Sequence, residues 1–345
     1  MAPRDDQRAK GVTDPHAGSL TLPEVPRHAS ATNLRVNVGS VSLKNPIIAA
    51  SGTFGYGLEF AHLVDLNKLG GIVVKGLSRE PMPGAPAPRM CETPSGMLNA
   101  IGLQNIGVRA FVAEKLPELT RYQTAIIANV FGSWTADYVE VIRVLEDTDG
   151  LAAYELNISC PNVEKGGAEY STNPDLTAEV VSAARRAAAK RPLWVKLSPV
   201  VGMIGLIAKA AESSGADALV IANTYPAMCL DVHNRRSRLG STTGGLSGPA
   251  IKPITVRLVH EASRVCKIPI VGLGGIESPA DVAEYLLVGA SAVEVGTAHF
   301  ADPRASQRLA AGLETWCRDQ NLFDISELQG SFRTELAGKK SPKSL

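Results

Sequence analysis

The sequence predicts an α/β protein built as a single TIM (β/α)8 barrel, because strand-like and helix-like segments alternate from about residue 45 onward. The strand-like runs are apolar nearly throughout and rich in β-branched residues, as expected for parallel strands buried on both faces. Eight such units over this length favour a closed barrel over an open, doubly wound sheet. The expected strands are 47–51, 71–75, 125–130, 153–158, 193–197, 218–222, 268–273 and 292–296. Ala- and Leu-rich helices are expected between them at 175–190, 203–214, 254–266 and 279–288.

The two ends of the chain differ from the barrel in composition. Residues 1–33 combine prolines with charged residues and show no helical apolar stripe, so we expect a disordered or surface-draped extension. This segment also lacks the apolar stretch of a secretory signal. The barrel domain is expected at 34–330, and residues 331–345 are expected to form a frayed, lysine-containing tail.

Composition and charge exclude several classes of protein. The chain has 345 residues, of which 45% are hydrophobic and 20% charged, so it can form a large core and is not globally disordered. Its 35 Lys and Arg against 34 Asp and Glu give a net charge of +1, which argues against a nucleic-acid or membrane-surface binder. Five cysteines without a C-x-x-C pair predict no metal site and favour a reducing, cytoplasmic location. No apolar run approaches the roughly 20 residues of a membrane span.

Polar residues and glycines collect at the carboxyl ends of the predicted strands, where TIM barrels carry their active sites. They are Ser51, Lys75, Asn129, Asn157, Lys196, Asn223, the pair Gly274–Gly275 and the pair Gly296–Thr297. A lysine that closes an apolar strand is unfavourable to bury unless it meets an anion or a polarised atom. Lys75 and Lys196, on the second and fifth strands, would point into one bowl, which favours a ligand site over packing alone.

The run 157–162, Asn-Ile-Ser-Cys-Pro-Asn, follows the fourth predicted strand. Pro161 ends that strand, so Cys160 is expected on a loop at its carboxyl end, between Asn157 and Asn162. Carboxamides offer both a donor and an acceptor to a planar polar ligand, and a thiol among them is placed for proton transfer. A buried structural cysteine is the alternative, and the motif alone does not separate the two.

Glycines end the seventh and eighth predicted strands, at Gly274–Gly275 and Gly296, each before a helix start. Glycine lets backbone N–H groups approach a phosphate, and these two loops form the usual phosphate site of the fold. A further glycine-rich loop, 244–249, precedes a helix after the sixth strand. The sequence therefore favours a phosphorylated ligand over glycines that only make tight turns.

A long insertion, 78–109, separates the second and third predicted strands. Insertions of this length in a compact barrel are usually functional. We expect this one to fold over the mouth and to lay Asn99 beside Asn157 and Asn223. Converging carboxamides and a lysine suit a ring with imide and carboxylate groups, whereas Asn105 could be an ordinary turn residue.

Five motifs in order give the chain a resemblance to class 1 dihydroorotate dehydrogenases, flavin-dependent TIM barrels of pyrimidine synthesis. They are NPIIAASGTFG from Asn45, SGMLNAIGLQN from Ser95, NISCPN from Asn157, VKLSP from Val195 and VGTAHFADP from Val295. The similarity runs from about residue 34 to residue 323. The segment GGLSGPAIKP from Gly244 resembles the 1B subclass, whose catalytic chain works with an electron-transfer subunit carrying FAD and a [2Fe–2S] cluster. Class 2 enzymes use a serine base and an N-terminal membrane helix, which this sequence does not resemble.

The resemblance implies a role for each matching residue. Cys160 resembles the general base, and Lys75 resembles the lysine that contacts both flavin and substrate. The residues implied for FMN binding are Ser51, Lys75, Gly76, Asn129, Asn157, Lys196, Ala222, Gly248, Gly274, Gly275, Gly296 and Thr297. Those implied for substrate binding are Lys75, Asn99, Ala100, Ile101, Gly102, Leu103, Asn157, Asn162, Asn223 and Thr224. Phe131 stands where the family usually has a small residue, which leaves the packing there open.

The implied reaction oxidises (S)-dihydroorotate to orotate, with one FMN per chain taking hydride from C6 while Cys160 takes the C5 proton. Electrons would pass to NAD+ through the iron–sulfur flavoprotein partner, which alone carries FAD and [2Fe–2S]. The expected assembly is a homodimer within a heterotetramer. Three alternatives stay open: a fumarate-linked 1A enzyme, another FMN-dependent pyrimidine-reducing barrel, and a non-redox phosphate-binding isomerase or lyase.

Overall fold

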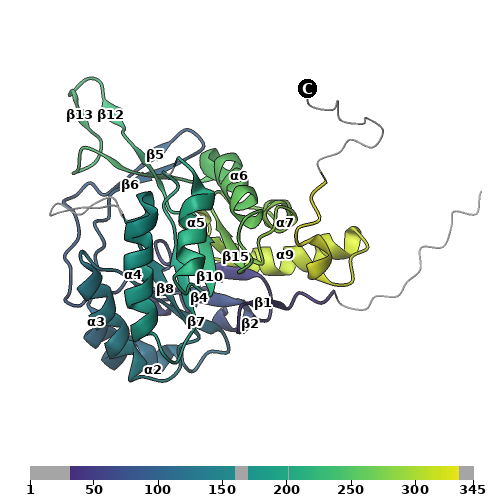
Figure 1. Ribbon diagram of the computed structural model, residues 1–345. Helices are drawn as coiled ribbons and strands as arrows, with labels where there is room; N and C mark the ends of the chain where they lie inside the picture. The colour runs from purple at the N-terminus through teal and green to yellow at the C-terminus, as the bar shows by residue number, and fades with distance from the viewer. Residues whose placement is uncertain (1–31, 160–169, 201, 334–345) are drawn as a thin grey trace, which may run out of the picture. The chain divides into compact units, whose positions relative to one another are not determined.

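Eight parallel strands close into a barrel in the computed structural model, which describes residues 32–159, 170–200 and 202–333 (Figure 1). In chain order the strands are β3 (Ile47–Ala49), β4 (Gly71–Val73), β7 (Ala125–Val130), β8 (Ala153–Asn157), β9 (Leu193–Lys196), β10 (Ala218–Ile221), β15 (Ile270–Leu273) and β16 (Ala292–Val295). Each pairs in parallel with the next along the chain, and β16 closes onto β3. The predicted TIM (β/α)8 barrel is confirmed.

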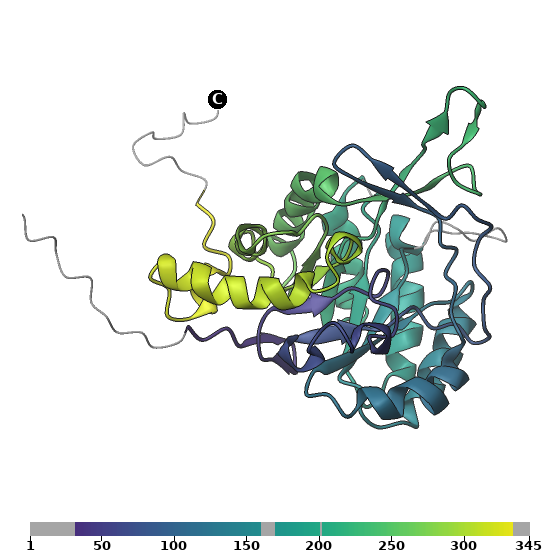
Figure 2. The same ribbon diagram turned by 180° about the vertical axis from the view of Figure 1, so that it is seen from behind.

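Helices follow seven of the eight strands and pack on the outside of the barrel (Figures 1 and 2). They are α1 (Val108–Ala110), which continues through the π-turn Phe111–Lys115 into α2 (Leu116–Leu119), then α3 (Thr135–Glu146), α4 (Pro174–Ala187), α5 (Ile204–Ser213), α6 (Lys252–Ser263), α7 (Pro279–Leu287), α8 (Ala298–Ala301) and α9 (Ala305–Asp319). Only two short 3-10 turns, Leu58–Phe60 and Leu66–Lys68, follow β3. Further 3-10 turns lie at Tyr170–Thr172, Pro249–Ile251 and Ile325–Leu328.

Local sequence explains where the helices begin and which face they bury. Helix α4 begins after Asn173, whose side chain accepts hydrogen bonds from the backbone of Asp175 (2.8 Å) and Leu176 (3.2 Å). Helix α9 buries an apolar stripe at Leu309 and Leu313, four residues apart on one helix face. It packs against β3, where the first unit of the barrel lacks an α-helix of its own (Figure 2).

A β-hairpin, β1 (Val36–Val38) and β2 (Val41–Leu43), closes the amino end of the barrel. Its buried side chains Val38, Val41 and Leu43 pack with at least one residue from each of the eight strands. That inner cluster comprises Ile48, Val73, Ile127, Ala153, Trp194, Ala218, Val220, Val271 and Ala292. Alternate residues of each strand thus fill the amino half of the barrel with apolar side chains, and the residues between them pack outward against the helices.

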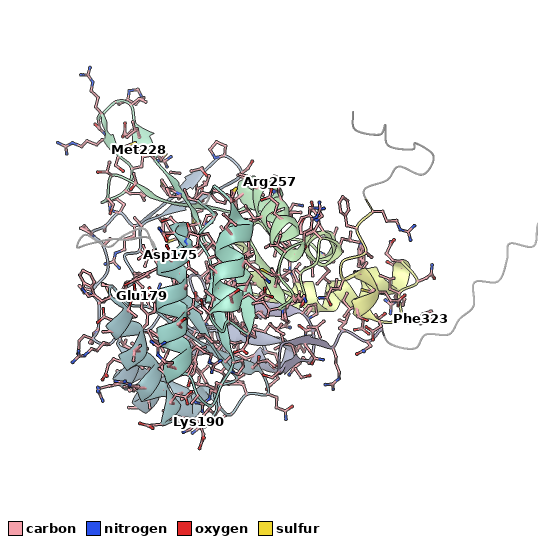
Figure 3. All side chains as sticks on the ribbon, viewed as in Figure 1. Asp175, Glu179, Lys190, Met228, Arg257 and Phe323 are labelled. Atoms are coloured by element: carbon pink, nitrogen blue, oxygen red, sulfur yellow. The ribbon has the colours of Figure 1, made fainter. Side chains whose placement is uncertain are left out.

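Two insertions combine into a small antiparallel sheet beyond the strands of the barrel. Strands β5 (Met90–Thr93) and β6 (Gly96–Asn99) come from the insertion after β4, and β11 (Tyr225–Ala227) and β14 (Gly244–Ser247) from the segment after β10. The order is β11-β14-β6-β5, so the two insertions pair through β14 and β6. Between β11 and β14 a hairpin, β12 (Leu230–Asp231) and β13 (Arg236–Ser237), projects from the sheet (Figure 1). Exposed Met228 lies near its base (Figure 3).

The two predicted terminal segments lie mostly outside the described residues. At the first described residues, Thr32 donates a hydrogen bond to the carbonyl of Leu322 (3.1 Å), and Asn33 forms a parallel β-bridge with Asp324. Among the described cysteines Cys91, Cys229, Cys266 and Cys317 are free thiols. None of the helices in the described part of the chain combines the length and apolar character that a bilayer crossing requires.

Candidate active site

The predicted site residues that the structure describes lie at the carboxyl ends of the barrel strands or in the loops beyond them. Ser51, Lys75 and Gly76, Asn129, Asn157, Lys196, the run Ala222–Thr224, Gly274–Gly275 and Gly296–Thr297 belong to all eight strands and their following loops. Because parallel strands bring these ends to one face of the barrel, residues far apart in the sequence meet there. Cys160 and Asn162 lie outside the described residues.

A polar layer fills the barrel interior directly above the apolar cluster. Asn129, Glu155, Lys196 and Glu294 each lie two residues beyond an inward-facing apolar residue on the same strand, so they point into the lumen. The Lys196 ammonium lies 3.1 Å from Glu155 Oε1 and 3.0 Å from Glu294 Oε2. Asn129 also donates its amide to Glu155 Oε1. Asn129 and Lys196 stand out in the sequence as strand-end residues, whereas neither glutamate was predicted at the site.

Burial and pairing set the charge of this layer. Burial opposes ionisation of Lys196, but the carboxylates of Glu155 and Glu294 hold its pKa above the ordinary value. Burial likewise opposes ionisation of Glu155, yet the Lys196 charge and the Asn129 hydrogen bond leave the pKa of that carboxyl lowered. Lys196 and Glu155 are therefore an ionised pair inside the barrel.

Lys75, at the end of β4, has a different environment. Its side chain is largely shielded from solvent, and burial lowers its pKa. Among the described residues the structure records no ion pair or hydrogen bond to its ammonium group. A shielded lysine without a carboxylate partner is suited to an anionic ligand.

Two asparagines meet through a serine between β8 and β10. Ser159 donates its hydroxyl proton to Asn157 Oδ1 (2.8 Å) and accepts a hydrogen bond from Asn223 Nδ2 (2.6 Å). Tyr138 of α3 donates to the carbonyl of Asn157 (3.0 Å). Phe131 is buried with its ring edge-on to that of Tyr138, 6.5 Å between centroids, so the large side chain supports this region. The bridging role of Ser159 was not predicted.

The antiparallel sheet brings Asn99 to the β10 side of the site. Asn99 Nδ2 donates to the carbonyl of Gly245 (3.2 Å), and a Cβ placed on Gly245 would lie only 2.0 Å from Thr224 Oγ1. Asn99 is therefore near Thr224, whereas it was expected beside Asn157 and Asn223, and within the described residues no hydrogen bond joins it to either of those asparagines. The following residues, Ala100–Leu103, have no regular secondary structure, and Gly102 and Leu103 have positive φ of 71° and 55°.

Three glycine loops meet at the other side of the mouth. A Cβ on Gly275 would lie 2.8 Å from the carbonyl oxygen of Gly248, and one on Gly248 would lie 2.8 Å from Gly96 Cα. Gly275 and Gly248 also have left-handed φ, of 64° and 97°. Both the lack of space and the backbone conformation therefore exclude a side chain at these positions. Thr297 donates its hydroxyl to Ser247 Oγ (2.8 Å), which ties the β16 loop to β14.

The start of α7 differs from the expected phosphate site in one respect. Ser278 caps the helix as predicted, but Asp281 accepts hydrogen bonds from the backbone of Glu277 (3.0 Å) and Ser278 (2.8 Å). A carboxylate therefore already occupies this helix terminus. An anion in the cradle would depend on the glycine loops and on Thr297 instead.

The other predicted residues are buried close to this layer. Ala222 follows β10 and is 1% exposed. At Gly76 a Cβ would lie 2.8 Å from Asn129 Oδ1, so glycine leaves space beside that amide. Within the described residues no cluster of three or more His, Cys, Asp or Glu side chains is arranged to hold a metal ion.

Comparisons with known proteins agree with this geometry. The dihydroorotate dehydrogenase family profile matches residues 33–316. A Solibacter usitatus protein, provisionally named dihydroorotate dehydrogenase A (fumarate), is 57% identical over 87% of this chain and 98% of its own length. The dihydroorotate dehydrogenase B (NAD(+)) catalytic subunit of Pelobacter propionicus is 50% identical over 87% of this chain and 98% of its own length.

A solved structure supports the fold independently. The crystal structure of the Eimeria tenella enzyme DHODH in complex with ferulenol superposes with a TM-score of 0.74 at 21% identity, covering 87% of this chain and 88% of that one. At that identity the likeness speaks for the barrel alone. The family match over most of the barrel, together with relatives about half identical along nearly their whole length, shows that the chain belongs to the dihydroorotate dehydrogenase family of FMN-dependent oxidoreductases.

Proposed function

We propose that this chain is the catalytic subunit of a 1B-type dihydroorotate dehydrogenase, acting in the cytoplasm. It would oxidise (S)-dihydroorotate to orotate with Cys160 as the base and pass electrons to NAD+ through a partner subunit. The observation that carries the substrate assignment is the Lys75 ammonium, which has no partner among the described residues and lies at the same barrel end as the linked Asn157 and Asn223 side chains. A cation and two carboxamides complement a carboxylate and a cyclic imide.

The residues present fit an FMN at this end of the barrel. The buried Asn129 Oδ1 has no hydrogen-bond partner among the described residues, lies in the interior layer and suits the polar edge of a flavin ring. The loops of Gly248, Gly274 and Gly275 would hold the phosphate through their backbone N–H groups, since none of these three residues has a side chain of its own to block the approach. FMN, when bound, supplies the acceptor for the hydride that leaves C6 of the substrate.

The protein side of the mechanism divides among three groups of residues. Cys160 would remove the C5 proton; a free thiol titrates near about 8.5, so the rate should rise with pH as the thiolate forms. Lys75, Asn99, Asn157 and Asn223 would orient the substrate ring, which supplies proximity more than chemistry. Lys196 would stabilise negative charge on the flavin's N1–O2 edge. The Asn157–Ser159–Asn223 chain would keep two of these carboxamides in fixed positions.

The electron acceptor is the finer part of the proposal. The Gly244 segment and the Pelobacter relative support the NAD(+)-linked type, with FAD and [2Fe–2S] on the partner and a homodimer within a heterotetramer. The Solibacter relative carries a fumarate-linked name at 57% identity, which makes the 1A type the second candidate. After β15 the sequence GLGGIES lacks the spacing of a nicotinamide-binding loop, so NAD+ reduction should need the partner.

Two measurements test the proposal. Acid release and chromatography of the cofactor should yield one FMN per chain and no FAD. The isolated chain should reduce an artificial dye with dihydroorotate, reduce little NAD+, and gain NAD+ reduction when an iron–sulfur flavoprotein partner is added. Fumarate reduction as fast as dye reduction would support the 1A type instead, and absence of any flavin from folded protein would refute the cofactor assignment.

A further inference from the structure

The interior layer holds two carboxyl groups and only one cation. Glu155 and Glu294 are both fully buried, and Lys196 contacts each of them at about hydrogen-bond distance, 3.1 and 3.0 Å. With every group ionised, the cluster would carry a net charge of −1 in a solvent-excluded interior. Among the described residues no second cation reaches these carboxyls to balance that charge.

The hydrogen bonds around the two carboxyls are unequal. Among the described residues Glu155 accepts from both Lys196 and Asn129, whereas Glu294 accepts from Lys196 alone. Within that part of the chain one oxygen on each carboxyl has no hydrogen-bond partner, and the two carboxyls meet around the same Lys196 ammonium. Two carboxylates cannot hydrogen-bond to one another, because neither carries a donor. One proton would turn this contact into an O–H···O⁻ bond.

We propose that a single proton is shared within this cluster and is held mainly by Glu294, so that Glu155, Lys196 and Glu294 together carry no net charge. The carboxyl with more hydrogen bonds, Glu155, then remains the ionised partner of Lys196 and fixes the position of its ammonium. Glu294 serves as a positioning residue and a charge regulator for Lys196. This role rests on the proposed FMN site, since Lys196 lies where the flavin edge is expected.

Electrostatics supports the same assignment. Burial, followed by the negative charge of Glu155, raises the pKa of Glu294 well above its ordinary value, while Lys196 opposes that rise. The titratable groups acting on Glu294 are Glu155 of β8 and Lys196 of β9, from the elements that face it across the lumen. Like charges in a shared buried site usually leave one carboxyl protonated.

The charge state matters for flavin reduction. Hydride transfer brings negative charge to the flavin, and an additional buried carboxylate close to Lys196 would oppose it. In a neutral cluster a single carboxylate, Glu155, balances the charge of the Lys196 ammonium, which remains available to the flavin edge. The proton on Glu294 therefore raises the tendency of the bound flavin to accept a hydride.

Infrared difference spectroscopy and potentiometry of three glutamine variants test the proposal. The parent should show a protonated-carboxyl band at pH 7, with or without FMN. The band should disappear in Glu294→Gln, and also in Glu155→Gln, where Glu294 becomes the only counter-ion of Lys196 and ionises. It should persist in Glu146→Gln, a control at a buried glutamate that instead pairs with Tyr154 and Arg191. The flavin midpoint potential of Glu294→Gln should match that of the parent.

Unfolding equilibria give a readout that is independent of flavin. The folded parent holds one proton that the unfolded chain releases above the ordinary Glu pKa of about 4.3, so its stability declines as pH rises through this range. Relative to the parent, Glu294→Gln should gain about tenfold in its folding equilibrium constant for each pH unit between 5 and 7. Any of four results would overturn the shared proton. They are a parent without the carboxyl band, a Glu294→Gln variant that keeps the band, a stability difference between the two that does not change with pH, and a flavin midpoint potential that is higher in Glu294→Gln than in the parent. Loss of flavin binding alone would refute only the proposed function.

Discussion

Replacing Ser159 by alanine tests the hydrogen-bond chain that fixes Asn157 and Asn223. The substitution removes two bonds, of 2.8 and 2.6 Å, which leaves Asn223 Nδ2 without its partner and Asn157 Oδ1 with only the longer bond from the Ser159 backbone (3.4 Å). Leaving such groups unsatisfied costs about 1–3 kcal/mol. If both asparagines orient the substrate, kcat/KM should fall by roughly 5- to 150-fold, since about 1.4 kcal/mol corresponds to a factor of ten.

The assay is orotate formation with an artificial dye as acceptor, together with urea unfolding of each variant. Ser291→Ala is a matched control: Ser291 is also buried and accepts one hydrogen bond, from Gln329 Nε2 (2.7 Å), but lies at the opposite end of the barrel. The control should lose comparable stability and keep its kcat/KM. A Ser159→Ala enzyme within twofold of the parent in kcat/KM, or an equal loss in the control, would refute the reasoning.

Four further variants test separate parts of the barrel and its site. Cys160→Ala should retain FMN but lose roughly 10²–10⁴-fold in turnover, and near-normal orotate production would exclude Cys160 as the base. Lys75→Met should raise KM for dihydroorotate without lowering the free energy of unfolding, because Lys75 has no partner among the described residues. Lys196→Met should lower the free energy of unfolding by about 3–5 kcal/mol, because two buried carboxyls lose their cation. Burial lowers the pKa of His299 to about 4, so the folded protein keeps it neutral while the unfolded chain protonates it below about 6.5. As the pH falls from about 6.5 to about 4, the parent should lose about 3 kcal/mol of unfolding free energy, and His299→Gln should not show this loss. Chemical unfolding that gives the same pH dependence for both proteins would contradict the prediction.

The alternation of apolar runs and helical segments was sufficient to predict the barrel and its mouth. All eight strands were found because parallel strands buried on both faces leave an uninterrupted apolar signal. The bounds of β7 were predicted correctly, and the other seven predicted strands extended further than the observed ones, as at 268–273, where β15 begins only after Pro269. The pairing of β6 with β14 could not be predicted, because it joins two insertions more than 140 residues apart.

Within the site, the residues at strand ends were predictable and those inside the lumen were not. Lys75, Lys196 and the asparagines stand out because each closes an apolar run. Glu155 and Glu294 fall inside such runs, where a single charge reads as an interruption of a strand. Their partnership with Lys196 depends on the curvature of the closed barrel, which brings β16 across the lumen from β9. A glutamate two positions after an inward apolar residue is the signal that could have revealed them.

The hairpin formed by β1 and β2 closes the amino end of the barrel, so the interior opens toward the carboxyl end of the strands. Its apolar side chains fill the amino end together with residues from every strand, so within the described residues water has no polar path upward from that side. Among the described residues, the mouth is therefore the route by which we expect protons to reach the interior carboxyls. A cofactor bound at the mouth would block access of water to the interior carboxyls. Hydrogen–deuterium exchange at Glu294 should therefore be much slower in the FMN-bound enzyme than in the enzyme without FMN.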